Sequence, residues 1–179
     1  MRIISGKYGG LRLSPPGNLP GTRPTTDTAR EGIFNILEHG LTLEGARMLE
    51  LFAGTGAVGF EAVSRGAASV TMVEKNPRLT AYLSGEAARL HIDEVHVVRA
   101  DVFRFLGAHP EPFDVIFADP PYGLGTLTEL PELVLTPRWL RPGGWFILEH
   151  DQSARFEDHP CFSRKRNYGN TIFSIFSLH

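Results

Sequence analysis

An acid, two prolines and an aromatic residue directly follow the apolar run 113–118: Asp119, Pro120, Pro121 and Tyr122. Proline lacks a backbone N–H and fixes φ, so the segment is stiff and offers the Asp119 carboxylate and the Pro120 carbonyl as hydrogen-bond acceptors. Two acceptors can hold both N–H groups of an exocyclic amino group on a nucleobase and localise its nitrogen lone pair. Because an ordinary aspartate pKa is about 4, we expect positioning to matter more than general-base catalysis. Tyr122 would stack on the base, which must be unpaired or flipped out.

Three glycines with the spacing G-x-G-x-x-G stand between a predicted strand and a predicted helix: Gly54, Gly56 and Gly59. Such glycines permit a tight turn and a close approach of the backbone to a ligand at a helix N-terminus. Glu74 ends the next predicted strand, where its carboxylate can accept hydrogen bonds from ribose hydroxyls. The pattern fits both NAD and S-adenosylmethionine, and it also fits glycines that only shape a turn.

Two further acids bear on the choice of cofactor. Glu50 stands just before the glycine loop, where a carboxylate would repel a pyrophosphate but attract the ammonium and sulfonium of S-adenosylmethionine. Its alternative role is as a partner of a helix dipole or a cation. Asp101 directly follows the third predicted strand and could accept from an adenine amino group, cap the next helix, or do both. We therefore expect S-adenosylmethionine as cofactor, with S-adenosylhomocysteine as product.

The elements that must position these residues follow a regular order. From residue 47 onward, short apolar runs alternate with helical patterns, which is typical of an α/β protein with a parallel sheet. The predicted strands are 47–53, 69–74, 95–100, 113–118 and 145–150, and the predicted helices are 57–65, 77–90 and 126–136. A turn at 141–144 would deliver the fifth strand. The runs 162–168 and 171–178 flank Gly169-Asn170 and predict an antiparallel hairpin.

The predicted fold is therefore α/β and Rossmann-like, with a seven-stranded sheet that is mostly parallel and ends in a C-terminal antiparallel hairpin. In a doubly wound sheet, ligands bind beyond the carboxyl ends of the strands, where the strand order reverses. That point falls between the first and fourth strands of this series. The glycine loop ends the first strand and Asp119 follows the fourth, so both motifs should face one cleft.

Residues 1–26 read as a small β-hairpin and loop extension that precedes a larger domain over 27–179. The strand-like pieces 2–5 and 11–13 are separated by Gly9-Gly10. Thr28 and Glu31 have the spacing of a capping box and predict the start of an amphipathic helix.

Basic residues gather near the two ends of the chain. Residues 1–30 contain one acid, Asp27, and five basic residues: Arg2, Lys7, Arg12, Arg23 and Arg30. A second basic run occupies 164–166. Such patches suit phosphate contacts, although a solvated face has the same composition.

Composition restricts the class of protein. The 179 residues, 42% hydrophobic with a formal net charge of −2, fit one soluble globular domain and exclude a uniformly basic nucleic-acid-coating protein. No run has the length of a membrane span, and the N-terminus lacks the apolar core of a signal peptide. Cys161 is the one cysteine, and no Cys/His cluster has zinc spacing. We expect a cytoplasmic monomer without a metal or a membrane partner.

Five blocks of the chain together resemble the RsmD family, bacterial enzymes that methylate N2 of a guanine in small-subunit ribosomal RNA: RIISGKYGG, RPTTDTAREGIFNIL, ELFAGTGAVGFEAVSRGA, ADPPYG and YGNT. The resemblance covers nearly the whole chain. It implies a Class I methyltransferase fold, S-adenosylmethionine as cofactor, and 16S ribosomal RNA or the small ribosomal subunit as partner. The family often has phenylalanine at the position of Tyr122, so stacking would be retained without the phenolic hydroxyl.

Position by position, the resemblance implies three sets of site residues. Gly54, Gly56, Gly59 and Glu74 match the cofactor block, and Asp119-Pro120-Pro121-Tyr122 matches the catalytic motif. The segment Arg23-Pro24-Thr25-Thr26 also matches the family and would lie near substrate or cofactor. We expect the RNA contacts to be Arg2, Lys7, Arg12, Arg23, Thr25 and Thr26.

Other functions fit some of these residues. A DNA adenine-N6 methyltransferase usually carries an extra target-recognition domain, and a protein glutamine methyltransferase usually has asparagine in place of Asp119. An NAD-dependent oxidoreductase shares the glycine loop but has no use for the segment 119–122. That segment could also be a rigid turn with a core aromatic, and a noncatalytic RNA-binding module would leave the cleft unexplained.

Overall fold

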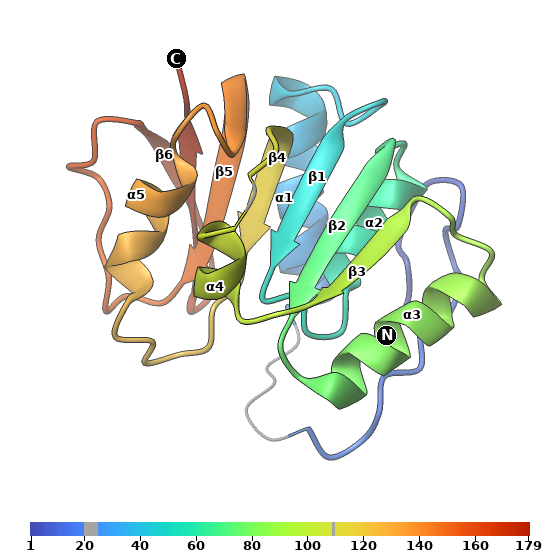
Figure 1. Ribbon diagram of the computed structural model, residues 1–179. Helices are drawn as coiled ribbons and strands as arrows, with labels where there is room; N and C mark the ends of the chain where they lie inside the picture. Colours follow the sequence, from blue (N-terminus) through green and yellow to red (C-terminus); the bar gives the residue numbers. More distant parts are fainter. Residues whose placement is uncertain (20–24, 109) are drawn as a thin grey trace.

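The computed structural model describes residues 1–19, 25–108 and 110–179. Its centre is a seven-stranded sheet with the order β3-β2-β1-β4-β5-β7-β6 (Figure 1). The strands are β1 Arg47–Leu51, β2 Ser69–Glu74, β3 Val95–Arg99, β4 Phe113–Ala118, β5 Leu140–His150, β6 Phe162–Tyr168 and β7 Thr171–Ser177. The first five pair in parallel, while β7 pairs antiparallel with both β5 and β6. The predicted mostly parallel sheet with a C-terminal hairpin is confirmed.

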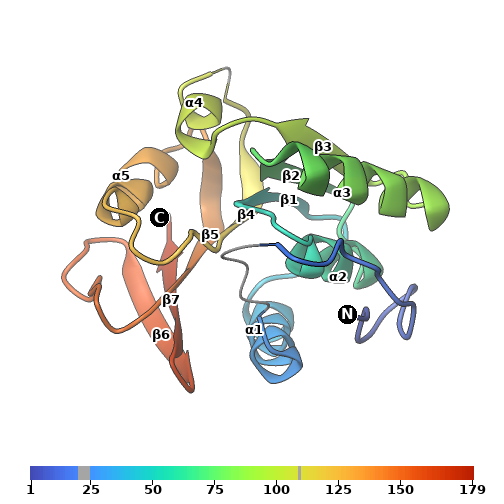
Figure 2. The same ribbon diagram turned by 90° about the horizontal axis from the view of Figure 1, so that it is seen from below.

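Helices cover both faces of this sheet. They are α1 Asp27–Gly40, α2 Ala57–Ser64, α3 Pro77–Arg89, α4 Val102–Leu106 and α5 Leu130–Val134, preceded by the short 3-10 helix η1 Leu127–Glu129. Figure 2 shows α1 and α2 on one side of the sheet and α4 and α5 on the other. The sheet divides the apolar core into two clusters, one on each face. Met48 of β1 packs with α1 and α2, whereas the adjacent Leu49 packs with α4 and α5. Burial on both faces explains the nearly continuous apolar strands of the sequence.

Two expected elements differ in extent. The predicted helix 126–136 is divided into η1 and the five-residue α5. The predicted turn 141–144 lies within β5, which begins at Leu140 and pairs irregularly with β4 near Phe113. Gly143 has a φ of 78° there, so the chain turns locally without leaving the sheet.

The N-terminal hairpin is packed against the body of the protein. Within it, Ile3 N donates to Leu11 O at 3.0 Å, and the side chains of Ile3 and Leu13 are buried in the core. Its backbone is fastened to α2, because Ile4 N and Ser5 N donate to the buried Glu61 carboxylate at 2.7 and 3.0 Å.

The predicted capping box is wrong by two residues. Helix α1 begins at Asp27, and its N-cap is Thr26, whose hydroxyl accepts a hydrogen bond from Ala29 N at 3.2 Å. Thr26 has extended backbone angles suited to a cap, whereas Thr28 already lies in the first turn. Asp27 then forms an ion pair with the buried Arg30 at 2.9 Å.

Across the described ranges, no helix is long and apolar enough to cross a membrane. The same residues contain no group of three or more His, Cys, Asp or Glu side chains that could hold a metal ion.

Candidate active site

A cavity of about 920 Å³ opens at the carboxyl ends of the parallel strands, where the strand order reverses between β1 and β4. This is the predicted position of the cleft. Ten of the residues expected in the site line it: Thr25, Thr26, Glu50, Gly54, Glu74, Asp101, Asp119, Pro120, Pro121 and Tyr122. The strand ends thus bring the glycine loop and the segment 119–122 to one space.

The three glycines of the loop have different surroundings. Gly54 lines the cavity with a φ of 55°, and Gly56 is the N-cap of α2 with a φ of 70°. Both lie in the left-handed region, where a side chain would be strained. Gly59 lies behind the loop, where an added Cβ would overlap the Glu50 carboxylate and the Met72 methyl group. Gly59 therefore permits α2 to pack closely on β1 and β2.

Glu74 braces the loop from the end of β2. Its Oε2 accepts from Gly54 N at 2.9 Å, and its Oε1 accepts from Asn76 N at 2.8 Å. A carboxylate oxygen has more than one acceptor direction, so these backbone bonds leave capacity for ligand hydroxyls.

Asp101 takes the helix-capping role that the sequence left open. Its Oδ1 accepts from Phe103 N and Arg104 N at 3.0 and 3.2 Å, which starts α4. The residue also lines the cavity, beside an edge-to-face pair of Phe52 and Phe103. Sequence reasoning missed these two rings. Phe52 has a φ of 57°, a left-handed conformation that nothing in its residue type indicated.

Glu50 is a buried acid at the floor of the cleft. Its Oε2 accepts from Gly59 N at 3.1 Å, and the residue is only 3% exposed. Burial raises its pKa to about 8, and the charges of Asp119 and Glu74 contribute in the same direction. A cation bound beside it would reverse this effect by favouring the ionised form.

The segment 119–122 stands at the cavity rim as β4 ends. Pro120 is buried, whereas Pro121 and Tyr122 are exposed, Tyr122 to 50%. The alternative that Tyr122 is a core aromatic is therefore wrong. Burial raises the pKa of Asp119 well above its usual range, and the charge of Glu149 raises it further. This differs from the ordinary value assumed from the sequence, and it makes Asp119 a stronger proton acceptor than expected.

Glu149 is a site residue that sequence reasoning missed. It is 6% exposed, lines the cavity near the end of β5, and accepts a hydrogen bond from Thr25 Oγ1 through Oε2 at 3.1 Å. The pairing of Ala118 with Leu148 puts Asp119 and Glu149 at equivalent positions on adjacent strands. Burial raises the pKa of Glu149 to about 7, and the bond from Thr25 opposes this rise. The sequence contains one sign of this role: Glu149 follows the apolar run of the fifth strand, as Asp119 follows that of the fourth.

The predicted basic RNA contacts are not in the cleft. Arg2 pairs with Asp27 at 3.8 Å and Lys7 with Glu94 at 3.9 Å, and neither they nor Arg12 line the cavity. Arg23 lies outside the described residues.

Comparisons with known proteins agree with this geometry. The family model described as "Conserved hypothetical protein 95" matches residues 1–177. Ribosomal RNA small subunit methyltransferase D of Escherichia coli strain K12 is 38% identical over 151 residues, which cover 84% of this chain and 75% of that protein.

Solved structures show the same fold. The structure of the methyltransferase yhhF from Escherichia coli is 31% identical with a TM-score of 0.89, covering 100% of this chain and 98% of that one. A Thermus thermophilus 16S rRNA N2 G1207 methyltransferase, solved with AdoMet and guanosine, is 21% identical with a TM-score of 0.69 and covers 87% and 44%. The family match and the Escherichia coli relative together show that the chain belongs to the RsmD family of ribosomal RNA small subunit methyltransferases.

Proposed function

We propose that this protein transfers the methyl group of S-adenosylmethionine to the exocyclic N2 amino group of a guanine in 16S ribosomal RNA. The observation that carries the proposal is the placement of Asp119 and Pro120 opposite the Gly54 loop across one cavity. The name of the Escherichia coli relative supports small-subunit ribosomal RNA as the substrate class. The structure of the guanosine-bound Thermus enzyme, which shares the fold, is consistent with the guanine N2 target.

The cleft residues fit S-adenosylmethionine better than a dinucleotide. Glu50 is a buried acid beside the loop, where an ammonium group would stabilise its charge and a pyrophosphate would be repelled. Glu74 and Asp101 would accept from the ribose and adenine. When bound, the cofactor supplies a methyl group on a positively charged sulfur.

The described residues then act on the base. The Asp119 carboxylate and the Pro120 carbonyl accept the two N2–H bonds, which localises the nitrogen lone pair and directs it at the methyl group. Once the new N–C bond forms, the amino nitrogen must lose one proton. Asp119 is placed to receive it, because burial and Glu149 raise its pKa. Tyr122, exposed at the rim, covers the face of the base.

Glu149 favours guanine over adenine as the target base. Beside its N2 amino group, guanine carries an N1–H donor, whereas adenine has an acceptor at N1. Thr25 holds Oε2 of Glu149, and no described residue donates to Oε1. We assign Oε1 as the acceptor for N1–H, next to the amino group held by Asp119.

Methyl transfer from labelled S-adenosylmethionine tests the proposal. Protein would be incubated with small subunits or 16S RNA from cells that lack the activity, and the labelled RNA digested to nucleosides. The expected product is N2-methylguanosine. Label on DNA, on protein, or on an adenine of the RNA would overturn the assignment.

A further inference from the structure

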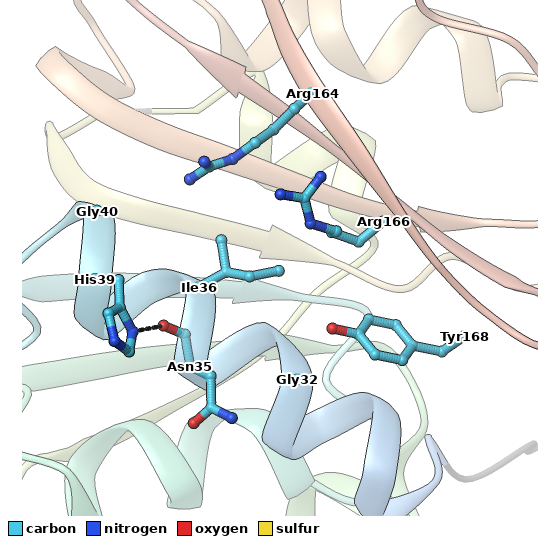
Figure 3. Close-up of a pocket in the computed structure, with 8 residues that line it drawn as sticks. All are labelled: Gly32, Asn35, Ile36, His39, Gly40, Arg164, Arg166 and Tyr168. Atoms are coloured by element: carbon cyan, nitrogen blue, oxygen red, sulfur yellow. Dashed lines mark hydrogen bonds between the residues drawn. The ribbon is translucent and has the colours of Figure 1, made fainter.

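A second cavity, of about 390 Å³, lies between α1 and β6 and shares no lining residue with the cleft (Figure 3). It is lined by Gly32, Asn35, Ile36, His39, Gly40, Arg164, Arg166 and Tyr168. None of these side chains is acidic. We refer to this cavity as the α1–β6 groove.

The walls of the groove are fixed by close packing. An added Cβ at Gly32 would overlap the Tyr168 ring, and one at Gly40 would overlap the Trp145 indole. Two aromatic side chains of the sheet therefore rest on the bare backbone of α1, one toward each end of the groove. Gly40 ends α1, whereas Gly32 lies in its interior, where glycine destabilises a helix by about 0.5–1 kcal/mol relative to alanine.

Two arginines project over the groove toward α1 (Figure 3). The Arg164 guanidinium stacks on the Trp145 ring at 5.0 Å, and its buried Nε has no hydrogen-bond partner among the described residues. Arg166 donates through Nη1 to Lys165 O at 3.0 Å. Lys165, between them on the opposite face of the strand, forms an ion pair with Glu157, whereas neither arginine pairs with an acid in the described ranges. Two neighbouring guanidinium groups that are held in place and have no acidic partner are suited to donate hydrogen bonds to phosphate oxygens.

The groove begins beside the cleft. Tyr168 lines the groove, and its partner in the β6–β7 register, Thr171, lines the cleft. From Tyr168 back to Arg164, four residues of extended strand lead away from the cleft over roughly 13 Å. If a base enters the cleft beside Thr171, the RNA strand that flanks its nucleotide reaches the groove.

We propose that Arg164 and Arg166 bind backbone phosphates of the RNA strand that flanks the target nucleotide. The α1–β6 groove thereby sets the path of the RNA, while the cleft selects the base. The inference rests on the proposed function, because it takes RNA as the substrate.

Fluorescence anisotropy with labelled small-subunit RNA tests the groove, using the full chain at several salt concentrations. Two lost phosphate contacts should weaken binding by the Arg164→Gln/Arg166→Gln protein at least roughly tenfold and reduce the slope of log K against log salt by about 1.4. The matched control is Lys165→Gln, on the same strand but paired with Glu157, which should bind within about twofold of wild type. Wild-type affinity and slope in the double variant would overturn the inference.

Two parallel measurements separate the possible failures. If the wild-type protein methylates no RNA, the proposed function fails; if it methylates RNA and the double variant binds normally, only the groove inference fails. Loss of binding to intact small subunits with unchanged binding to naked RNA would assign the groove to a ribosomal protein instead and overturn it. Binding of S-adenosylhomocysteine, measured by calorimetry, checks that the double variant is folded. If it is not, the RNA affinity of the single variant Arg166→Gln replaces it in the test, because Arg166 is exposed and its substitution should leave the fold intact.

Discussion

At the scale of single residues, the site depends on two acids that share a buried space. Asp119 directly follows β4, at the position equivalent to Glu149 of β5, and the charge of Glu149 disfavours ionisation of Asp119. Asp119 could be predicted from the sequence because prolines mark it as an exceptional strand end. Glu149 could not, since an acid at a strand end is common and only the adjacency of β4 and β5 gives it a role.

The raised pKa values predict how methyl transfer depends on pH. Asp119 must be ionised to accept the amino N–H and the released proton, and its raised pKa delays ionisation to higher pH. The single-turnover rate should therefore fall as the pH drops, and the fall should begin at a higher pH than the titration of an ordinary aspartate would give. Glu149→Gln removes the neighbouring charge and lowers the pKa of Asp119, so this decline should begin at lower pH. An identical pH profile in the variant would show that the two acids are not coupled.

Glu149 should also determine the preference for guanine. 2-Aminopurine keeps the amino group but lacks N1–H, so wild-type protein should methylate RNA containing it at least about tenfold more slowly than guanine RNA. Glu149→Ala removes both acceptor oxygens and should reduce this difference, mainly through a slower reaction with guanine. The comparison needs single-turnover rates on matched RNAs. Undiminished discrimination in the variant would refute contact with N1–H.

At the scale of elements, hydrophobic patterning was sufficient for the sheet. The five apolar runs became the parallel strands β1 to β5, and the runs flanking the Gly169-Asn170 turn became β6 and β7. The N-cap at Thr26, the short α5 and the extension of β5 back to Leu140 were not predictable. They depend on tertiary packing that local residue types do not encode.

Gly59 tests the packing of α2 on β1. Gly59→Ala places a methyl group against Glu50 and Met72, so we expect a loss of about 1–3 kcal/mol in the free energy of unfolding. The matched control is Gly85→Ala in α3, where an added Cβ meets nothing within 4 Å. That exposed substitution should stabilise the protein by about 0.5–1 kcal/mol. Urea unfolding measures both, and equal stability of the two variants would contradict the packing argument.

At the scale of the whole molecule, the N-terminal hairpin belongs to the same packed body as the sheet. From the sequence, residues 1–26 were predicted to be an extension of the main domain, because glycines and prolines interrupt them. The contact with Glu61 was invisible from the sequence, since that residue lies in α2, 57 positions from Ile4. Its buried carboxylate also pairs with Arg65 at 2.8 Å.

Removing this anchor should loosen the hairpin. Glu61→Ala leaves the N–H groups of Ile4 and Ser5 without their acceptor, and we expect a loss of about 3 kcal/mol in stability. Glu61→Gln retains one acceptor oxygen and should lose less. Hydrogen exchange at these two amides, combined with urea unfolding, measures the effect. Protected amides in the alanine variant would show that other contacts hold the hairpin.

The central claim is that Asp119 holds the amino group that receives the methyl group. Single-turnover methyl transfer to small-subunit RNA by Asp119→Ala tests it most directly, with S-adenosylhomocysteine affinity measured on the same protein. The rate should fall at least about 100-fold, while the affinity for S-adenosylhomocysteine stays within about twofold of wild type, because the proposed cofactor contacts are with other residues of the cleft. A wild-type rate in Asp119→Ala would contradict the account.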